Sequence, residues 1–307
     1  MSAERRARLL MFGALVLLGA GWGLGVPFNK IAVTAGHRDF GIIFWQAMVA
    51  AGLLLPWMLT RGGLPLHRRA LALYAFVAVA GTLVPNFASF SAQRYLPSGV
   101  SALVLSFIPM VALPIAVLMR TDHASPGRLL GLVAGAVGVA LIVLPGDALP
   151  DRSMVPWVLV ALIGTVFYAI EGNGIARFGT AGLSPVQLVA GAVLLTALVA
   201  GPLALARGVF ISPLRVWGQG DWAVLAGGVL NVGSYVGYLW LVGRAGAVFA
   251  AQVSYLVTGF GVFWSMVLLG ERFSPWFWAA GAVIFLGLAL VQPRPAPVPG
   301  AAGEALR

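Results

Sequence analysis

Long apolar stretches separated by short polar connections dominate the pattern of the chain. Crossing a bilayer as a helix takes about 20 mostly apolar residues. Stretches of this length lie at 9–34, 40–60, 70–93, 98–119, 126–145, 154–176, 183–206, 221–242, 246–269 and 275–292. Each should be a helix, because a helix satisfies its own backbone hydrogen bonds in lipid. The pattern therefore predicts an all-α membrane protein with ten transmembrane helices.

Composition supports this prediction and narrows the class. Of the 307 residues, 60% are hydrophobic and 9% are charged, whereas a soluble domain carries about 25% charged residues. So few charges exclude a soluble enzyme, a secreted domain and a disordered chain. The chain has no cysteine, and its three histidines lie in connecting segments. We therefore expect no disulfide, no metal centre and no cofactor.

The distribution of basic residues predicts the orientation. With the N-terminus in the cytoplasm, twelve basic residues fall in cytoplasmic segments and seven in the opposite ones, as the positive-inside rule requires. The first apolar stretch continues past Gly25 and is longer than the core of a signal peptide, so we expect an uncleaved first span. We predict a multi-pass protein of the bacterial inner membrane with cytoplasmic termini and a flexible cytoplasmic tail at 293–307.

The net charge of +10 has a bland explanation. Its arginines are scattered singly or in short groups over many connections, which is typical of topology signals rather than of a nucleic-acid-binding stripe. The predicted partner is therefore the lipid bilayer and not nucleic acid.

An internal repeat relates the two halves of the chain. At a shift of 149 residues, Asp122 falls on Glu271 and Ser125-Pro126 falls on Ser274-Pro275. The repeat predicts two units of five spans each, at 1–150 and 151–292. Because five is odd, the second unit must be inserted upside down relative to the first. Inverted repeats are typical of transporters that alternate between two openings.

The chain resembles the EamA-type carriers of the drug/metabolite transporter superfamily. The resemblance rests on Gly21-Trp22-Gly23 and Asn29-Lys30 in the first span, Leu96-Pro97-Ser98-Gly99 and Pro109 in the fourth, and Asp122 and Gly270-Glu271-Arg272, each followed by Ser-Pro. It implies a central cavity walled by spans 1–4 and 6–9, with spans 5 and 10 outside. It also implies export of small metabolites, often amino acids, or of toxic compounds. Asp122 replaces the family's usual glutamate, and Thr258 replaces its usual proline.

Polar side chains at helical spacing indicate where a solute would bind. Two apolar stretches each carry such a set on one helix face, and a polar face within lipid should point at other helices or at a water-filled cavity. Hydrogen bonding between helices without a ligand is the alternative. Together with an aromatic wall residue, a lone acid and two residues of the ninth span, they are the candidate substrate-binding residues: Trp22, Asn86, Ser89, Gln93, Glu171, Asn231, Ser234, Tyr235, Tyr238, Gln252 and Tyr255.

Glu171 is the one acidic residue clearly inside an apolar stretch. A carboxylate in a membrane is costly and is a functional candidate by default. Two interpretations stay open: the side chain binds a substrate amine or a proton, or it reaches the cytoplasmic face and pairs with an arginine such as Arg177. Lys30, the only lysine, is expected to reach the outer interface. An ion pair between Lys30 and Glu171 is not expected.

Three classes of function remain to be compared. An intramembrane enzyme is disfavoured because no span carries a histidine, an aspartate pair or an H-E-x-x-H motif, and a phosphate-binding loop is also lacking. The inverted repeat favours a secondary carrier over a channel or a scaffold, which is the alternative. We predict an exporter, not an enzyme, that moves amino acids or related amphipathic or aromatic compounds by alternating access; its oligomeric state stays open, with a monomer favoured. Coupling to protons stays open.

Overall fold

The described part of the chain consists of helices and the turns between them. The computed structural model describes residues 3–60, 62–144 and 149–291, so the predicted tail at 293–307 lies outside the described residues. The long helices of the first half are α1 (Ala3–Thr34), α2 (Asp39–Leu59), α3 (Arg68–Val77), α4 (Val84–Gln93), α5 (Ser98–Leu105), α6 (Ile108–Leu118) and α7 (Pro126–Val143). Those of the second half are α8 (Val155–Phe178), α9 (Pro185–Ala206), α10 (Gln219–Ala245), α12 (Val253–Leu269) and α13 (Pro275–Val291). Three short segments complete the order: η1 (Ala78–Leu83), η2 (Arg152–Met154) and α11 (Ala247–Ala250).

Helical segments follow the ten predicted stretches closely. Within the described residues, eight are long and apolar enough to cross a membrane, and α12 and α13 are shorter apolar helices of 17 residues each. Large apolar side chains cover the outer surface, including Leu17, Leu118 and Leu198, which are 73%, 82% and 68% exposed. This surface needs lipid around it, so the chain is a multi-pass membrane protein.

Serine–proline pairs begin three of the helices, α7, α9 and α13. The Ser125 side chain accepts a hydrogen bond from the Arg128 N–H at the start of α7. Ser184 accepts one from the Gln187 N–H, and the Gln187 side chain accepts one from the Ser184 N–H in return, at the start of α9. These bonds satisfy N–H groups that a helix start leaves free, and the proline occupies the first helical position, where its missing N–H costs nothing.

Two predicted spans are interrupted, and a third contains a π-helix. The stretch 98–119 breaks at Ser106–Phe107 between α5 and α6, where Pro109 cannot bond back to the carbonyl of Leu105. The stretch 246–269 divides into α11 and α12 at residues 251–252. The π-helix η1 joins α3 to α4 and ends just before Pro85. Its wider turn lies where a proline ring would meet the Gly81 carbonyl in a regular helix.

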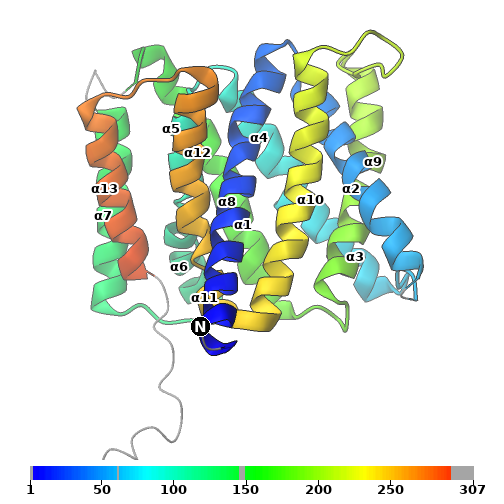
Figure 1. Ribbon diagram of the computed structural model, residues 1–307, viewed down its shortest axis with the longest axis horizontal. Coiled ribbons are helices and arrows are strands. Elements are labelled where there is room, and N and C mark those ends of the chain that lie inside the picture. Colours follow the sequence, from blue (N-terminus) through cyan, green and yellow to red (C-terminus); the bar gives the residue numbers. More distant parts are fainter. Residues whose placement is uncertain (1–2, 61, 145–148, 292–307) are drawn as a thin grey trace, which may run out of the picture.

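Helices of the two halves pack against each other across the whole bundle (Figure 1). Helix α1 packs against α10 and α12, α2 against α9, α4 against α8, and α7 against α13. Helices α7 and α13 form one edge of the bundle (Figure 1). Their backbones touch, because a Cβ on Gly131 would lie 2.7 Å from the Gly287 carbonyl oxygen and one on Gly287 would lie 2.8 Å from the Gly131 oxygen. Small residues allow this approach, which is how helices associate without a hydrophobic driving force.

The α4–α5 turn carries a charged clamp. Lys30 Nζ of α1 donates to the carbonyl oxygens of Gln93 at 2.7 Å and Leu96 at 2.9 Å. Glu271, in the α12–α13 connection, accepts from the backbone N–H groups of Ser98 at 2.6 Å and Gly99 at 3.0 Å. The ammonium thus meets the C-terminal end of one helix and the carboxylate the N-terminal end of the next, as helix dipoles favour. Lys30 therefore caps the C-terminal end of α4.

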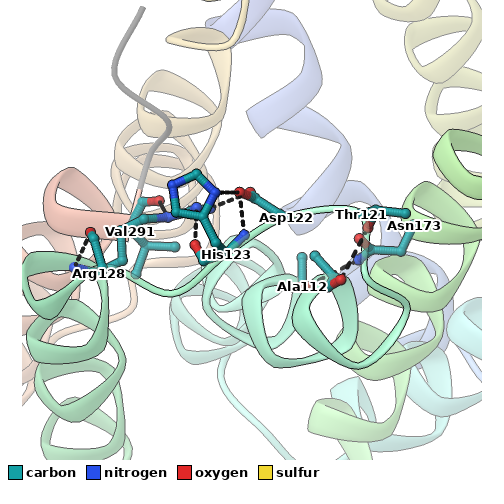
Figure 2. A network of polar contacts seen from close by, with 9 residues as sticks. Ala112, Thr121, Asp122, His123, Arg128, Asn173 and Val291 are labelled. Carbon is teal, nitrogen blue, oxygen red and sulfur yellow. Dashed lines mark hydrogen bonds and ion pairs between the residues drawn. The ribbon is translucent and has the colours of Figure 1, made fainter. Parts of the chain in front are cut away.

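A second polar network lies at the end of the bundle that holds the N-terminus (Figures 1 and 2). Arg128 donates to Asp122 Oδ2 at 2.8 Å, to the His123 carbonyl at 2.9 Å and to the Val291 carbonyl at 3.0 Å. This joins the α6–α7 turn to the last turn of α13. The hydrogen bond from Arg128 holds the pKa of Asp122 below its usual value of 3.8. Nearby, Asn173 Nδ2 donates to the Ala112 carbonyl at 3.1 Å and ties α8 to α6.

The connection between α9 and α10 folds back against the α1–α2 turn. Trp45 Nε1 donates to the Ile211 carbonyl at 2.8 Å, and Arg215 pairs with Asp221. His37 Nε2 lies 3.1 Å from Asp221 Oδ1 and 3.2 Å from Arg215 Nη2. Burial lowers the pKa of His37 below 6.5, against the opposing effect of Asp221. The histidine is therefore held mainly in its neutral form at pH 7.

Candidate functional site

A cavity of about 1000 Å³ lies among the helices of both halves. Its size is at the upper end of the range of about 300–1,000 Å³ found for small-molecule sites. Residues of α1, α2, α4, α8, α9, α10 and α12 make most of the lining, together with η1 and the α5–α6 break. Val77 of α3 and Leu288 of α13, the tenth stretch, also contribute. Most of the wall is apolar, with polar groups placed at intervals. This is the composition expected of a site for an amphipathic solute.

Eight of the eleven candidate residues line this cavity. They come from four helices, α1, α4, α8 and α10, and are Trp22, Asn86, Ser89, Gln93, Glu171, Asn231, Tyr235 and Tyr238. The polar sets on α4 (Asn86, Ser89, Gln93) and on α10 (Asn231, Tyr235, Tyr238), called the polar stripes below, thus face the same space from opposite halves of the chain. Trp22 and Tyr238 are neighbours within the wall, with ring centroids 6.1 Å apart.

Three candidates lie elsewhere, each for a local reason. Ser234 is buried and faces α1, because a Cβ on Gly21 would lie 3.5 Å from its Oγ. At about 100° per residue it is at the edge of the α10 stripe, about 60° from Asn231. Gln252 lies in the turn between α11 and α12 and is exposed. Tyr255 stacks on Phe285 of α13, with centroids 6.2 Å apart.

Hydrogen bonds within the cavity wall involve residues that were not among the candidates. Asn29 Oδ1 accepts from Gln46 Nε2 at 2.9 Å, joining α1 to α2. The Tyr168 hydroxyl donates to Asn86 Oδ1 at 3.0 Å, joining α8 to α4. All four side chains line the cavity. Tyr168 lies one helical turn before Glu171, so the spacing that marked the other stripes would also have marked it.

Glu171 is the one charged residue among the described residues that line the cavity. Its side chain is half-buried, and its carboxylate forms no hydrogen bond or ion pair with any residue that the structure describes. The predicted alternative of an arginine partner is not realised, since Arg177 is exposed and its guanidinium lies over the Phe178 ring. Gly81 of η1 lies directly beside the carboxylate, because a Cβ there would lie 2.4 Å from Glu171 Cδ.

Gln93 of α4 is a second polar position in the cavity wall, distant from Gly81 of η1, which lies beside the Glu171 carboxylate. Its side-chain Oε1 is buried and has no hydrogen-bond partner among the described residues, while its backbone carbonyl accepts from Lys30. Twelve residues of helix at about 1.5 Å each separate the two positions by about 18 Å. The cavity is therefore long, with a carboxylate at one position and an amide at another.

No set of three His, Cys, Asp or Glu side chains that could hold a metal ion occurs within the residues described. A single carboxylate without further anionic or imidazole ligands does not make a protein metal site. The wall is therefore suited to recognising an organic solute through hydrogen bonds, charge and apolar contact.

Two proteins with similar sequences have names of different content: one is called an uncharacterized transporter, and the other has a name that gives no activity. The chain is 24% identical over 238 residues to "Uncharacterized transporter YyaM" of Bacillus subtilis, covering 74% of this chain and 75% of that one. It is 29% identical over 279 residues to "Uncharacterized protein PA1977" of Pseudomonas aeruginosa, covering 86% and 89%. A crystal structure with 22% sequence identity superposes with a TM-score of 0.60, covering 93% of this chain and 96% of the other. That likeness supports the fold.

The model of one family matches the chain twice, once in each half. The EamA-like transporter family model fits residues 9–144 and again residues 155–292. The two matched segments correspond to α1–α7 and α8–α13, whose helices wall the single cavity described above. With nearly the whole length accounted for in this way, the chain belongs to the EamA-like transporter family, within the drug/metabolite transporter superfamily.

Proposed function

We propose that the chain is a secondary carrier of the bacterial inner membrane that exports small amphipathic or aromatic metabolites, amino acids among them, by alternating access. The observation that carries this proposal is the shared cavity, whose polar stripes come from α4 in the first half and α10 in the second. A site built from both halves is opened or closed by rocking one half against the other.

The same proposal includes ten membrane spans in two inverted units, residues 1–150 and 151–292. Support comes from the two family matches and from five apolar helical segments in each half. The N-terminus and the end of α13 lie at one end of the bundle (Figure 1), which accords with an even number of crossings. We place both ends in the cytoplasm because of the basic-residue count. Reporter fusions at each end test this placement, and an extracytoplasmic signal from either would overturn it.

Counterflow in liposomes tests the carrier proposal. The purified protein is reconstituted into vesicles loaded with unlabelled solute, and labelled amino acids and aromatic amines are screened outside. A carrier accumulates label transiently against its own gradient, because the excess unlabelled solute inside competes with the entered label for the inward-facing site and slows its exit. A channel gives equilibration without this overshoot, and a scaffold gives no flux beyond empty vesicles. Either of these outcomes would refute the proposal.

A further inference from the structure

The cavity has a charge of one sign. Among the described residues that line it, Glu171 is charged and no lysine, arginine or histidine accompanies it. Lys30 is nearby in sequence to the wall residue Asn29, but its ammonium is committed to the carbonyls of Gln93 and Leu96. An anionic solute would lose its hydration in this space without meeting a cationic side chain, which is costly. A cationic solute would meet a carboxylate.

The carboxylate of Glu171 is available to a ligand. It lies against the bare backbone of Gly81, where any side chain would displace it. The hydroxyl group nearest in sequence on the same helix, that of Tyr168, donates its hydrogen bond to Asn86 Oδ1 instead. Among the residues that the structure describes, none occupies the acceptor capacity of the Glu171 carboxylate on the cavity wall. A charged acceptor without a protein partner is an uncompensated cost unless something binds it.

Two tyrosines share the cavity wall with this carboxylate. Tyr168 lies three residues before Glu171 on α8, and Tyr235 lies on α10; both tyrosines line the cavity. Aromatic rings attract organic ammonium groups through their negatively charged faces. A carboxylate and tyrosine rings in one mostly apolar wall match a molecule that has an ammonium group at one end and an apolar body at the other.

We propose that Glu171, with Tyr168 and Tyr235, binds the ammonium group of amphipathic amines, and that such amines are preferred over anions of the same shape. The apolar part of the cavity binds the hydrocarbon or aromatic body of the amine. Gly81, which has no side chain, leaves room for the Glu171 carboxylate beside it. This assignment rests on the proposed carrier function, because it names the class of solute that the carrier would move.

Three indole compounds that differ in charge test this assignment. Binding of tritiated tryptamine to the purified protein is measured by scintillation proximity, with unlabelled tryptamine, tryptophan and indole-3-propionate as competitors. Tryptamine is a cation, tryptophan a zwitterion and indole-3-propionate an anion, so the body stays constant while the charge changes. We expect tryptamine to bind at least about tenfold more tightly than indole-3-propionate, a difference of about 1.4 kcal/mol.

Variants connect the preference to Glu171. Glu171→Gln keeps the shape and loses the charge, and we expect about a tenfold loss of tryptamine affinity with indole-3-propionate unchanged or improved. Gly81→Ala should also weaken tryptamine, because its Cβ displaces the carboxylate. Gly172→Ala is the matched glycine control, since a Cβ there meets nothing within 4 Å. Asp151→Asn is the matched charge control, because it removes one negative charge outside the cavity and keeps the capping capacity of the side chain.

The outcomes separate this assignment from the carrier proposal. If wild type binds no tryptamine, if indole-3-propionate competes equally, or if folded Glu171→Gln binds tryptamine as wild type does, the amine assignment is overturned. Counterflow of tryptophan can still proceed in those cases, and the carrier proposal then stands. If tryptamine binds through Glu171 but no probe shows counterflow, the site stands and the carrier proposal fails. Should Glu171→Gln not fold, Gly81→Ala and Glu171→Asp decide, with Glu171→Asp keeping the preference for the cation.

Discussion

Removing the Glu271 carboxylate should weaken the whole bundle, because it serves two buried backbone donors. Glu271 accepts from the N–H groups of Ser98 and Gly99 at 2.6 and 3.0 Å, and Ser98 is fully buried. Each buried donor left unpaired costs about 1–3 kcal/mol. In Glu271→Ala both lose their acceptor, so the sum is about 2–6 kcal/mol. Because Glu271 itself is partly exposed, water reaches the gap and favours the lower half of that range.

Glu271→Gln gives an intermediate expectation. The amide keeps one acceptor oxygen but loses the charge, and its NH₂ group cannot accept from the second N–H. We expect about 1–3 kcal/mol for this variant, the cost of one unpaired donor. The comparison between alanine and glutamine thus separates the two hydrogen bonds.

Reversible unfolding in mixed detergent and dodecyl sulfate micelles, followed by tryptophan fluorescence, measures these differences. Arg272→Ala is the control, because Arg272 is the exposed neighbour of Glu271 in the same connection, and we expect a change within about 0.5 kcal/mol. If Glu271→Ala is as stable as the Arg272→Ala control, the hydrogen bonds of Glu271 to Ser98 and Gly99 do not stabilise the fold, and the reasoning is refuted.

Two further perturbations address packing and pH. Gly287→Ala should lower the free energy of unfolding by about 1–3 kcal/mol in the same assay, because its Cβ would lie 2.8 Å from the Gly131 carbonyl and overpacking destabilises by that amount. Gly259→Ala is the control, since a Cβ there meets nothing within 4 Å. Equal stability of the two variants would contradict the close α7–α13 contact. Burial lowers the pKa of His37 below 6.5, so the unfolded chain binds this proton more readily and stability should fall as pH drops below 6.5. His37→Gln should flatten this part of the stability–pH curve between about pH 5 and pH 7, and a curve that keeps its wild-type slope would show that another group is responsible.

Much of the fold could be predicted because the signals were local. Apolar length placed the helical segments, and the Ser-Pro pairs at 125–126 and 184–185 mark helix starts through side-chain caps within a few residues. The breaks in the fourth and ninth stretches were harder to predict, because apolar residues continue through them. Pro109 was the local sign of the first break, and Pro85 was the local sign of the π-helix before it.

The candidate site was predictable to the extent that it lay on regular helices. Asn231, Tyr235 and Tyr238 share one face of α10 and line the cavity, as helical spacing predicted. Tyr255 was assigned from its place in the ninth stretch, and its ring stacks instead on Phe285 of α13. Gly81 could not be found from sequence, since its importance comes from Glu171 on another helix.

The two acids that align in the internal repeat have different partners in the structure. Asp122 and Glu271 align at a shift of 149 residues, yet Glu271 binds backbone N–H groups of α5 while Asp122 pairs with Arg128 of the following helix. Sequence similarity between the halves cannot tell which partner each acid meets, because the partner depends on how the two halves approach each other.

Lys30 offers amine-reactive reagents a single side-chain target. It is the only lysine in 307 residues, and its amine is partly buried and engaged by two carbonyls. Amine-reactive reagents therefore have one side chain to modify besides the amino terminus, and they need it deprotonated and released from those carbonyls. The rate of acylation at Lys30, as the one modified side chain, would then report how often the α4–α5 turn separates from α1.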